Sequence, residues 1–439
     1  MPTETRPSTA VVAPARGFGG EAPHVPGDKS ISHRAVIFSA LADGVSTVTN
    51  VAPGEDVASS MRCVAALGAT VERDGDRVRI HGGAWRAPAE PLDCGNSGTT
   101  MRLLMGAIAG RNVAATLDGD GSLRRRPMLR VAEPLAELGA LIETTAGNAP
   151  VFIRGGRPLH GATVALKVRS AQLASALTLA ATGAQGRTTI TGAGSARDHT
   201  NKMLPHYGVD VRVEGDAIVI DGPQNFHAAD FHVPGDPSAA AFWLAAAAIV
   251  PGSRIVVRDV NLNPTRLGFV YALQRMGAGV EISVESERPE PFGRIEVFAR
   301  PLHAIAVEAP DVPAILDELP LLGIVAAYAA GTTTVRGARE LRVKESDRIA
   351  VLATGLRALG GTIAEVDDGF DVTGPSSSLG AGSAALHGAT VASGGDHRLA
   401  MGFAIAALGA AGPVTIEEAD CCAISHPTFF SDLERLCRA

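Results

Sequence analysis

A pairing of one apolar helical stretch with one short strand recurs six times in the 439-residue chain, and this repeat restricts the possible folds most strongly. Each strand begins at a glycine and is rich in Val, Thr and Ile, as in GVSTVTNV. The glycines are Gly44, Gly110, Gly186, Gly252, Gly331 and Gly412. Their spacing of roughly 65–80 residues indicates a supersecondary unit, because the common solenoid repeats are shorter.

The six helical stretches are apolar nearly all round, which predicts that they are buried. They span residues 33–42, 100–109, 171–182, 238–250, 317–330 and 397–411. A polar loop, an amphipathic helix that ends at a glycine, and a polar hairpin follow most of the strands. The sixth copy ends before its hairpin. We expect the N-terminal tail to supply strands there, with Thr9–Val12 as an edge strand.

The same four residues, Val-Pro-Gly-Asp, open the first and the fourth copy at positions 25 and 233. Neighbouring units tend to pack together, so the six copies divide into two groups of three. A chain of this length also exceeds what one hydrophobic core supports. We therefore predict one domain from residues 25–232 and a second from residues 1–24 and 233–439, with residues 1–24 partly disordered.

Composition excludes several classes of function. The net charge of −7 gives no bulk attraction to nucleic acid or to an anionic membrane. No apolar run is long enough for a clear membrane span. The five cysteines show no metal-ligand spacing, and their odd number suggests free thiols in a reducing compartment. We expect a cytoplasmic, monomeric protein that binds small molecules rather than nucleic acid or membranes.

The polar loops before the buried helices carry the candidate chemistry. Residues 25–30 lead into a helix start, where free backbone N–H groups and the helix dipole favour an anion. Lys29 and Ser30 add a charge and a hydroxyl, and Arg34 lies one turn further along the same face. The spaced glycines of a Walker loop are absent. An ordinary capped helix explains this stretch alone equally well.

Seven cations fall at equivalent loop ends of the repeats: Lys29, Arg34, Arg126, Arg197, Lys344, Arg348 and Arg398. Each taken alone fits a solvated turn or helix start. Together they predict a cleft for substrates with several negative charges, because clustered cations repel one another and arginine suits carboxylate and phosphate. Asp317 and Glu345 would be isolated acids among them, as general acid–base groups are. Acids at a helix start also balance its dipole, so this alternative stays open.

Eight motifs occur in order from residue 25 onward: VPGDKSISHR, GNSGTTMRLL, RRRPM, SAQ, RDHTNKML, LDELP, LRVKESDR and DHRLAM. By these motifs the chain resembles the enolpyruvyl transferases, most closely the branch that acts on phosphoshikimate. The resemblance implies an α/β fold: a two-domain inside-out α/β barrel with six βαβαββ repeats, three per domain. It also implies transfer of the enolpyruvyl group of phosphoenolpyruvate to the 5-hydroxyl of 3-phosphoshikimate, with release of phosphate. This addition–elimination belongs to the shikimate pathway to chorismate and aromatic amino acids, and the resemblance implies no cofactor and no metal.

The resemblance further implies roles for individual residues. For 3-phosphoshikimate it implies Lys29, Ser30, Arg34, Ser170, Ala171, Gln172, Arg197, Asp317 and Lys344. For phosphoenolpyruvate it implies Lys29, Gly98, Arg126, Gln172, Arg348 and Arg398. Asp317 would take the proton from the attacking hydroxyl, while Glu345 and Lys29 would handle the protons on the enol methylene and the leaving phosphate. Gly98 has no methyl group to crowd the site, which predicts sensitivity to glyphosate, the family's known inhibitor.

Two alternatives and one departure from the family pattern accompany this interpretation. The sister branch acts on UDP-N-acetylglucosamine and generally carries a reactive cysteine in the loop that here spans residues 120–127, where none occurs. The second alternative is a non-catalytic anion-binding protein on the same scaffold, although carboxylates in a cationic cleft gain nothing for anion binding. Some members carry a lysine where Ile424 stands, and His426 is the nearest residue that could replace it.

Overall fold

Residues 8–194, 197–376 and 386–437 are described in the computed structural model of the chain. Contacts within the chain define two units. Unit 1 comprises Met1–Val25, Gly235–Glu287 and Pro291–Ala439, and unit 2 comprises Pro26–Pro234 and Arg288–Glu290. A three-residue segment, Arg288–Glu290, thus belongs to unit 2 although the residues on both sides of it belong to unit 1.

The described residues of unit 2 form three sheets, one for each of its repeats. The predicted strands lie inside these sheets as β3 (Ala42–Thr49), β7 (Ala115–Asp118) and β11 (Gly186–Thr191). Each pairs antiparallel with a hairpin: β4 (Thr70–Asp74) and β5 (Arg77–Gly82), β8 (Leu141–Thr145) and β9 (Asn148–Arg154), or β12 (Arg212–Glu214) and β13 (Ala217–Gly222). Short strands run parallel to the other side of each predicted strand. β14 (Phe226–His227) and β15 (Phe231–His232) pair with β3, β6 (Leu92–Asp93) pairs with β7, and β10 (Thr163–Ala165) pairs with β11.

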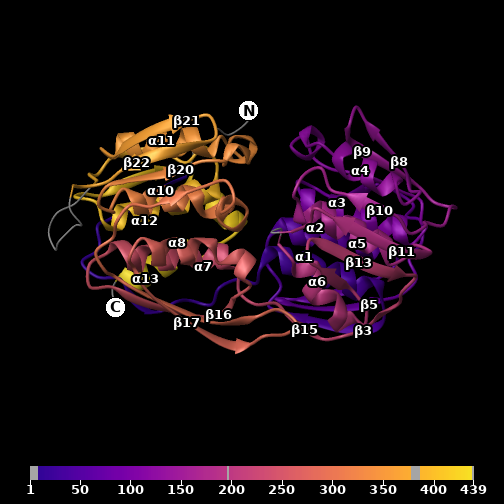
Figure 1. The fold of residues 1–439 in the computed structure, drawn as a ribbon. Helices are drawn as coiled ribbons and strands as arrows, with labels where there is room; N and C mark the ends of the chain where they lie inside the picture. Colours follow the sequence, from indigo (N-terminus) through magenta and orange to yellow (C-terminus); the bar gives the residue numbers. More distant parts are fainter. Residues whose placement is uncertain (1–7, 195–196, 377–385, 438–439) are drawn as a thin grey trace, which may run out of the picture. The chain divides into compact units, whose positions relative to one another are not determined.

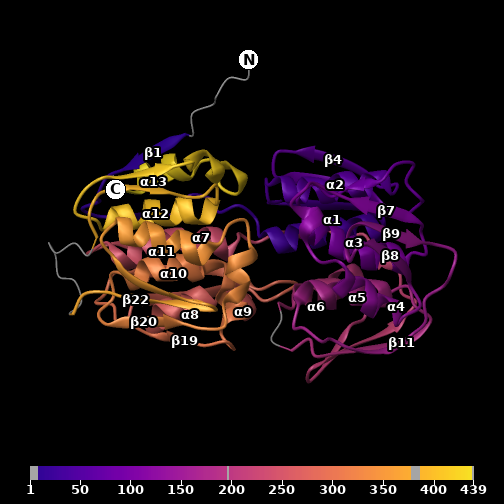
Figure 2. The same cartoon turned by 90° about the horizontal axis from the view of Figure 1, so that it is seen from above.

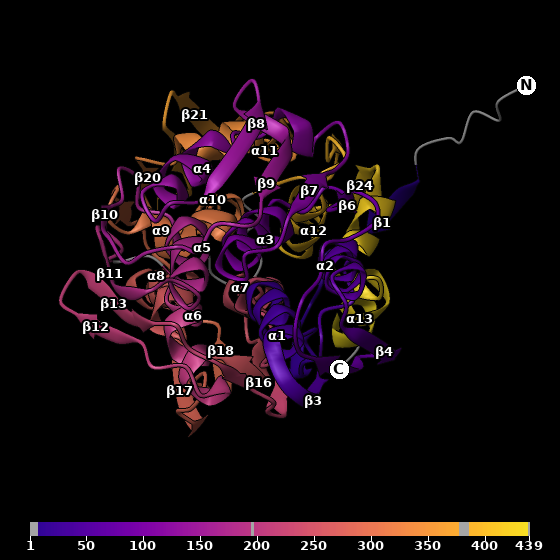
Figure 3. The same ribbon diagram turned by 90° about the vertical axis from the view of Figure 1, so that its right-hand side faces the viewer.

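Three helices form the interior of unit 2: α1 (Lys29–Leu41), α3 (Gly98–Gly110) and α5 (Ala171–Ala181). Nearly all of their residues are buried, as their apolar sequences predict, and α3 packs against both α1 and α5. Figure 3 shows the three helices grouped together, with strands such as β3, β8 and β11 further out. Further helices are α2 (Glu55–Ala66), α4 (Leu129–Ala136) and the short α6 (His199–Met203).

Unit 1 repeats this arrangement. Its predicted strands are β16 (Arg254–Asn261), β20 (Thr332–Val335) and β24 (Val414–Glu417), and its interior helices are α7 (Pro237–Ile249), α10 (Leu319–Ala326) and α12 (His397–Leu408). These three helices contact one another, with the sheets outside them (Figure 1). The other strands are β17 (Gly279–Ser286) and β18 (Phe292–Phe298), β19 (Ala306–Val307), β21 (Thr362–Val366) and β22 (Gly369–Thr373), and β23 (Thr390–Ala392). The remaining α-helices are α8 (Gly268–Arg275), α9 (Val312–Ile315), α11 (Arg348–Ala358) and α13 (Phe429–Cys437).

The N-terminal tail completes two sheets of unit 1. The predicted edge strand is confirmed: β1 (Thr9–Val12) runs antiparallel to β24, in the sheet whose own repeat lacks a hairpin, and Figure 2 shows it at the margin of the unit. The prediction of disorder is wrong for residues 19–21, which form β2 (Gly19–Glu21) parallel to β16. A side chain at Gly19 would meet the Arg254 carbonyl oxygen at 2.2 Å, so this close strand approach requires glycine.

The described topology confirms the inside-out α/β fold, with buried helices surrounded by small sheets. One predicted helix start is wrong. Asp317 and Glu318 do not open the long helix but lie in a 3₁₀ turn, Leu316–Glu318, and α10 begins at Leu319. Pro320 favours a new helix start, since a first-turn proline needs no hydrogen-bonded N–H. Among the described residues we find no helix with the length and apolar character of a membrane span.

Candidate active site

The helix starts in unit 2 carry most of the predicted binding residues. Asp28 caps α1 by accepting a hydrogen bond from the backbone N–H of Ile31, which leaves Lys29 in the first turn. The ammonium group of Lys29 lies 3.0 Å from a carboxylate oxygen of Asp56 in α2. Burial acts to raise the pKa of Asp56, but Lys29, His33 and Arg126 outweigh burial and lower it. Asp56 is therefore a carboxylate beside the predicted lysine.

A second group surrounds the start of α3. A side chain at Gly98 would place its Cβ 3.2 Å from Nη1 of Arg126 and 3.4 Å from Nη1 of Arg102. Arg102 donates a short hydrogen bond to the side-chain oxygen of Gln172, whose amide donates to the hydroxyl of Thr99 at 2.9 Å. Gly98, Arg126 and Gln172 are thus brought together, with two guanidinium groups close to a residue that has no side chain.

Arg34 joins three helices of unit 2. Its Nε donates to the hydroxyl of Thr200 in α6, its Nη2 to the hydroxyl of Ser175 in α5, and its Nη1 to the carbonyl of Ser30, each at 2.8 Å. The Ser175 hydroxyl donates in turn to the carbonyl of Ala171. Arg34 is only 2% exposed. Burial lowers its pKa to about 10, with Asp28 opposing this effect.

The remaining unit 2 residues lie beside this network. Ser170 is the N-cap residue of α5, directly before Ala171 and Gln172. Arg197 is half-buried, and its charge adds to the lowering of the Arg34 pKa that burial causes. The three arginines of the RRRPM motif differ, because Arg126 is half-buried whereas Arg124 and Arg125 are exposed.

In unit 1, Arg348 is the centre of a group of carboxylates. Its side chain is 2% exposed, and its Nη2 lies 2.7 Å from Glu345 while its Nε lies 2.7 Å from Asp396. The pKa of Glu345 and that of Asp396 are both lowered: burial acts to raise each, and the charge of Arg348 outweighs it. Both side chains are therefore ionised at neutral pH.

The same group holds the other predicted residues of unit 1. Asp317 lies 3.7 Å from the ammonium group of Lys344 and 3.8 Å from Nη1 of Arg348. Nη1 of Arg398 lies 3.4 Å from Glu318 and donates to the carbonyl of Asp317. Burial acts to lower the pKa of Arg398, but Asp317 and Glu318 outweigh burial and raise it. Unit 1 thus brings together Asp317, Lys344, Glu345, Arg348 and Arg398.

Several residues in these groups were not assigned a role from the sequence. Asp56 is the second residue of α2, where an acid is an ordinary partner of the helix dipole. Asp396 caps α12 and Glu318 precedes α10, so the same explanation covers both. A signal existed for Asp396, because Asp28 and Asp236 occupy the equivalent N-cap position in two other repeats.

The structure gives no support to His426 as a replacement for the lysine missing at position 424. Ile424 is exposed, whereas His426 is 2% exposed and lies against the rings of Trp243 and Phe429. Burial lowers the pKa of His426, and the nearby carboxylate of Asp432 offsets this only in part. A neutral histidine in an aromatic cluster is not a cation available to an anionic substrate.

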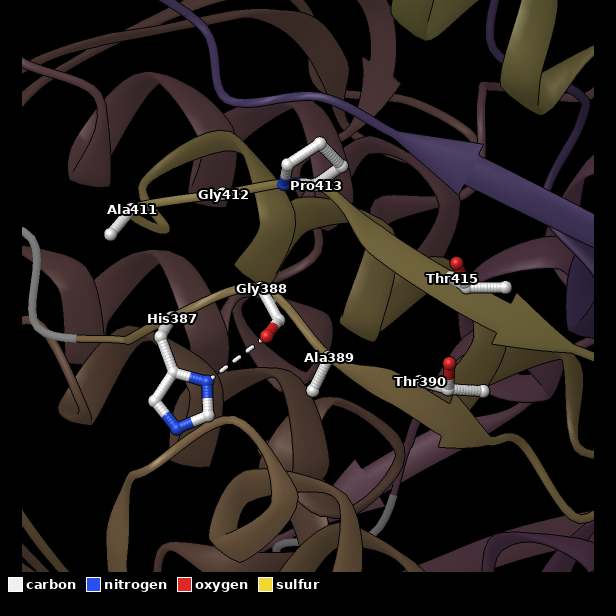
Figure 4. A pocket seen from close by; sticks show the side chains of 8 residues that line it. All are labelled: His387, Gly388, Ala389, Thr390, Ala411, Gly412, Pro413 and Thr415. Carbon is white, nitrogen blue, oxygen red and sulfur yellow. Dashed lines mark hydrogen bonds between the residues drawn. The ribbon is translucent and has the colours of Figure 1, made fainter.

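A hollow in unit 1 lies apart from the predicted residues. It is lined by His387, Gly388, Ala389, Thr390, Ala411, Gly412, Pro413 and Thr415, and Figure 4 shows them along β23, β24 and the loops before these strands. None of these residues belongs to either group of cations, and His387 contacts the carbonyl of Gly388 beside it. Within the described ranges, no cluster of three or more His, Cys, Asp or Glu side chains fits a metal ion.

Comparison with known proteins identifies the family. A family model described as EPSP synthase (3-phosphoshikimate 1-carboxyvinyltransferase) matches residues 19–433. A 3-phosphoshikimate 1-carboxyvinyltransferase from Halorhodospira halophila is 46% identical over 431 residues, covering 97% of this chain and 95% of the relative. One from Roseiflexus castenholzii is 45% identical over 422 residues, covering 94% and 96%. A solved structure of EPSP synthase from Acinetobacter baumannii has a TM-score of 0.88 and 40% identity, and the match covers 98% of each chain. The chain therefore belongs to the EPSP synthase (3-phosphoshikimate 1-carboxyvinyltransferase) family.

Proposed function

We propose that the protein transfers the enolpyruvyl group of phosphoenolpyruvate to the 5-hydroxyl of 3-phosphoshikimate and releases phosphate. The observation that carries this proposal is the group around Arg348, in which two candidate acid–base carboxylates, Asp317 and Glu345, lie beside buried or half-buried cations. Anion binding alone has no use for these carboxylates, whereas proton transfer does.

The phosphoshikimate ligands in unit 2 are those near the starts of α1, α5 and α6. They are Lys29, Ser30, Arg34, Ser170, Ala171, Gln172 and Arg197, and unit 1 adds Asp317 and Lys344. Arg34 can still donate hydrogen bonds to phosphoshikimate although it is buried. A guanidinium has five N–H donors, and the protein hydrogen bonds described above use three of them.

The phosphoenolpyruvate ligands are Lys29, Gly98, Arg126, Gln172, Arg348 and Arg398. In support, Gly98 leaves room beside the guanidinium groups of Arg126 and Arg102, and such forks suit phosphate and carboxylate. The positive charge of Arg398 is secured by Asp317 and Glu318, which raise its pKa against the effect of burial. These cations provide the charge neutralisation that a metal ion provides in other enzymes.

The chemistry follows as an addition and an elimination. A proton adds to the enol methylene carbon, and the adjoining carbon becomes cationic. The 5-hydroxyl oxygen bonds to that carbon while Asp317 accepts the hydroxyl proton. In the second half the methyl group loses a proton, the bond to the phosphate oxygen breaks, and phosphate leaves. Glu345 and Lys29 exchange the protons on the methylene carbon and on the leaving phosphate.

The contact between Glu345 and Arg348 bears on the first step. A proton donor must be protonated when it acts, yet Arg348 lowers the pKa of Glu345. An anionic substrate bound to Arg348 would neutralise part of that charge and raise the Glu345 pKa. Substrate binding would thus prepare Glu345 to carry a proton at the moment when the enol carbon needs one.

The chain acts as a cytoplasmic monomer in this proposal. The N-terminal tail of the same chain completes the sheets of unit 1, so no strand from a second copy is required. All five cysteines are free thiols, which suits a reducing compartment. Light scattering on the purified chain tests the oligomeric state, and a dimer mass would contradict this part of the proposal.

A phosphate-release assay tests the activity. The purified chain is mixed with phosphoenolpyruvate and 3-phosphoshikimate, with phosphoenolpyruvate and UDP-N-acetylglucosamine, or with phosphoenolpyruvate alone. We expect phosphate release only in the first mixture. Release with the UDP-sugar would support the sister activity, which the loop at residues 120–127, without a cysteine, disfavours. Binding of both substrates without release would support a non-catalytic anion-binding protein.

A further inference from the structure

A buried carboxylate–imidazole pair lies in unit 2 outside the residues discussed so far. Nδ1 of His199 lies 2.9 Å from Oε1 of Glu290, and the two side chains are 0% and 1% exposed. His199 is the first residue of α6, two residues after Arg197. Glu290 ends the short segment Arg288–Glu290, which lies between β17 and β18 in sequence but belongs to unit 2 by its contacts.

The pair fixes the orientation of the histidine ring. An ionised carboxylate can only accept hydrogen bonds, so the hydrogen is assigned to Nδ1 of His199. Nε2 of the same ring is buried and has no hydrogen-bond partner among the described residues. Glu290 is 1% exposed, and a carboxylate buried this deeply is costly unless it is hydrogen-bonded. The contact with His199 is therefore a structural requirement of this part of unit 2.

The network of Arg34 begins at the next residue. Thr200 follows His199 in α6, and its hydroxyl accepts a hydrogen bond from Nε of Arg34. It also lies 2.6 Å from the hydroxyl of Ser175 in α5. Holding His199 therefore holds Thr200, which in turn helps to hold Arg34 relative to α5. Glu290 also acts on Arg34 directly, because its charge opposes the lowering of the Arg34 pKa that burial causes.

We infer that Glu290 is a positioning residue for the phosphoshikimate-binding residues of unit 2. It acts through His199 on the start of α6, which contains Thr200 and follows Arg197. This inference rests on the function proposed above. It gives a role to the segment Arg288–Glu290, which belongs to unit 2 by its contacts and lies outside the eight sequence motifs. Glu290 itself touches His199 and need not touch the substrate.

Two physical effects of removing Glu290 have opposite signs, which makes the inference testable. Removing a negative charge that acts on Arg34 increases the positive potential there and strengthens binding of an anion. Removing the hydrogen-bond acceptor of His199 loosens the start of α6 and weakens binding of 3-phosphoshikimate. If positioning dominates, the dissociation constant of 3-phosphoshikimate rises. If charge alone matters, the constant falls.

The experiment measures this dissociation constant by calorimetry on the full chain, together with the KM for phosphoenolpyruvate and the melting temperature. We expect Glu290→Ala to raise the dissociation constant about tenfold, the effect of misplacing one hydrogen-bonded group, and to change the KM much less. Glu290→Gln keeps an acceptor oxygen and should restore the constant to within about threefold of wild type. An unchanged or lower constant in Glu290→Ala, or equal losses in both variants, would overturn the inference.

Two further variants keep the test decisive if Glu290→Ala does not fold. The amide of Asn matches the position of Nδ1 in histidine and that of Gln matches Nε2, so His199→Asn should bind 3-phosphoshikimate more tightly than His199→Gln. Equal or reversed affinities would contradict positioning through Nδ1.

Glu296→Ala is the matched control, since Glu296 is a 4% exposed residue of β18 that pairs with Arg254. It should lower the melting temperature and leave the constant unchanged; a similar rise there would overturn the inference. Failure of the wild-type chain to bind 3-phosphoshikimate would refute the proposed function instead.

Discussion

Replacement of Glu345 by Gln separates proton transfer from substrate binding. The amide keeps the size of the side chain beside Arg348 but cannot deliver or accept the proton. We expect kcat to fall about 10²–10⁴-fold, the usual contribution of a general acid–base group, or roughly 3–5 kcal/mol in the activation barrier. The KM for phosphoenolpyruvate should stay unchanged or fall slightly. Arg348 keeps Asp396 at 2.7 Å and loses one neighbouring negative charge that competes with the substrate.

The stability of this variant should change little. The Glu345 side chain is 46% exposed, and ion pairs of this exposure contribute about 1 kcal/mol or less. Glu340→Gln is the matched control, because Glu340 lies in the same segment, 3.0 Å from the ammonium group of Lys344, and its side chain is 64% exposed. Steady-state phosphate release gives kcat and KM for both variants. A kcat for Glu345→Gln close to that of the control would refute the acid–base role.

The remaining predictions concern the space at Gly98 and the buried His33. Gly98→Ala places a methyl group 3.2 Å from Nη1 of Arg126, so the inhibition constant of glyphosate, which is longer than phosphoenolpyruvate, should rise more than the KM for phosphoenolpyruvate. Equal changes in inhibition assays would contradict the steric explanation. Burial lowers the pKa of His33 to about 3 from an unfolded value of 6.5, so the unfolded chain binds the extra proton and stability falls as pH drops below about 6.5. Urea unfolding between pH 7 and 5 should show that His33→Asn removes up to about 1.4 kcal/mol of stability loss per pH unit, whereas an unchanged slope would contradict this assignment.

Local patterns predict the repeated elements of the fold well. The buried helices and the glycine-led strands are encoded by continuous runs of residues, so α7 and β11 appear close to their predicted positions. Pairings between distant segments are not encoded locally. The segment Gly19–Glu21 has little strand propensity, and only its approach to Arg254 makes it a strand. The start of α10 was misplaced because the acids before it look like an ordinary first helical turn.

The candidate site shows the same division. The sequence made candidates of Lys29, Arg348 and Asp317 because each belongs to a motif at an equivalent loop of the repeats, and their roles stay predictions. Asp56 was not a candidate, because its significance depends on the 3.0 Å contact with Lys29 across two helices. Glu290 is the extreme case: its partner His199 is 91 residues earlier in the chain, and nothing in the sequence between Val284 and Phe292 indicates that contact.

Incorporation of deuterium from D₂O tests the addition–elimination mechanism, since this mechanism turns the methylene carbon of phosphoenolpyruvate into a transient methyl group. The purified chain is incubated in D₂O with phosphoenolpyruvate and 3-phosphoshikimate, and the organic product is examined by proton NMR. We expect an enolpyruvyl ether whose methylene group carries deuterium, formed together with inorganic phosphate and formed more slowly by Glu345→Gln. Phosphate release with no deuterium in the methylene group would mean that the methylene carbon is never protonated, and it would contradict addition–elimination.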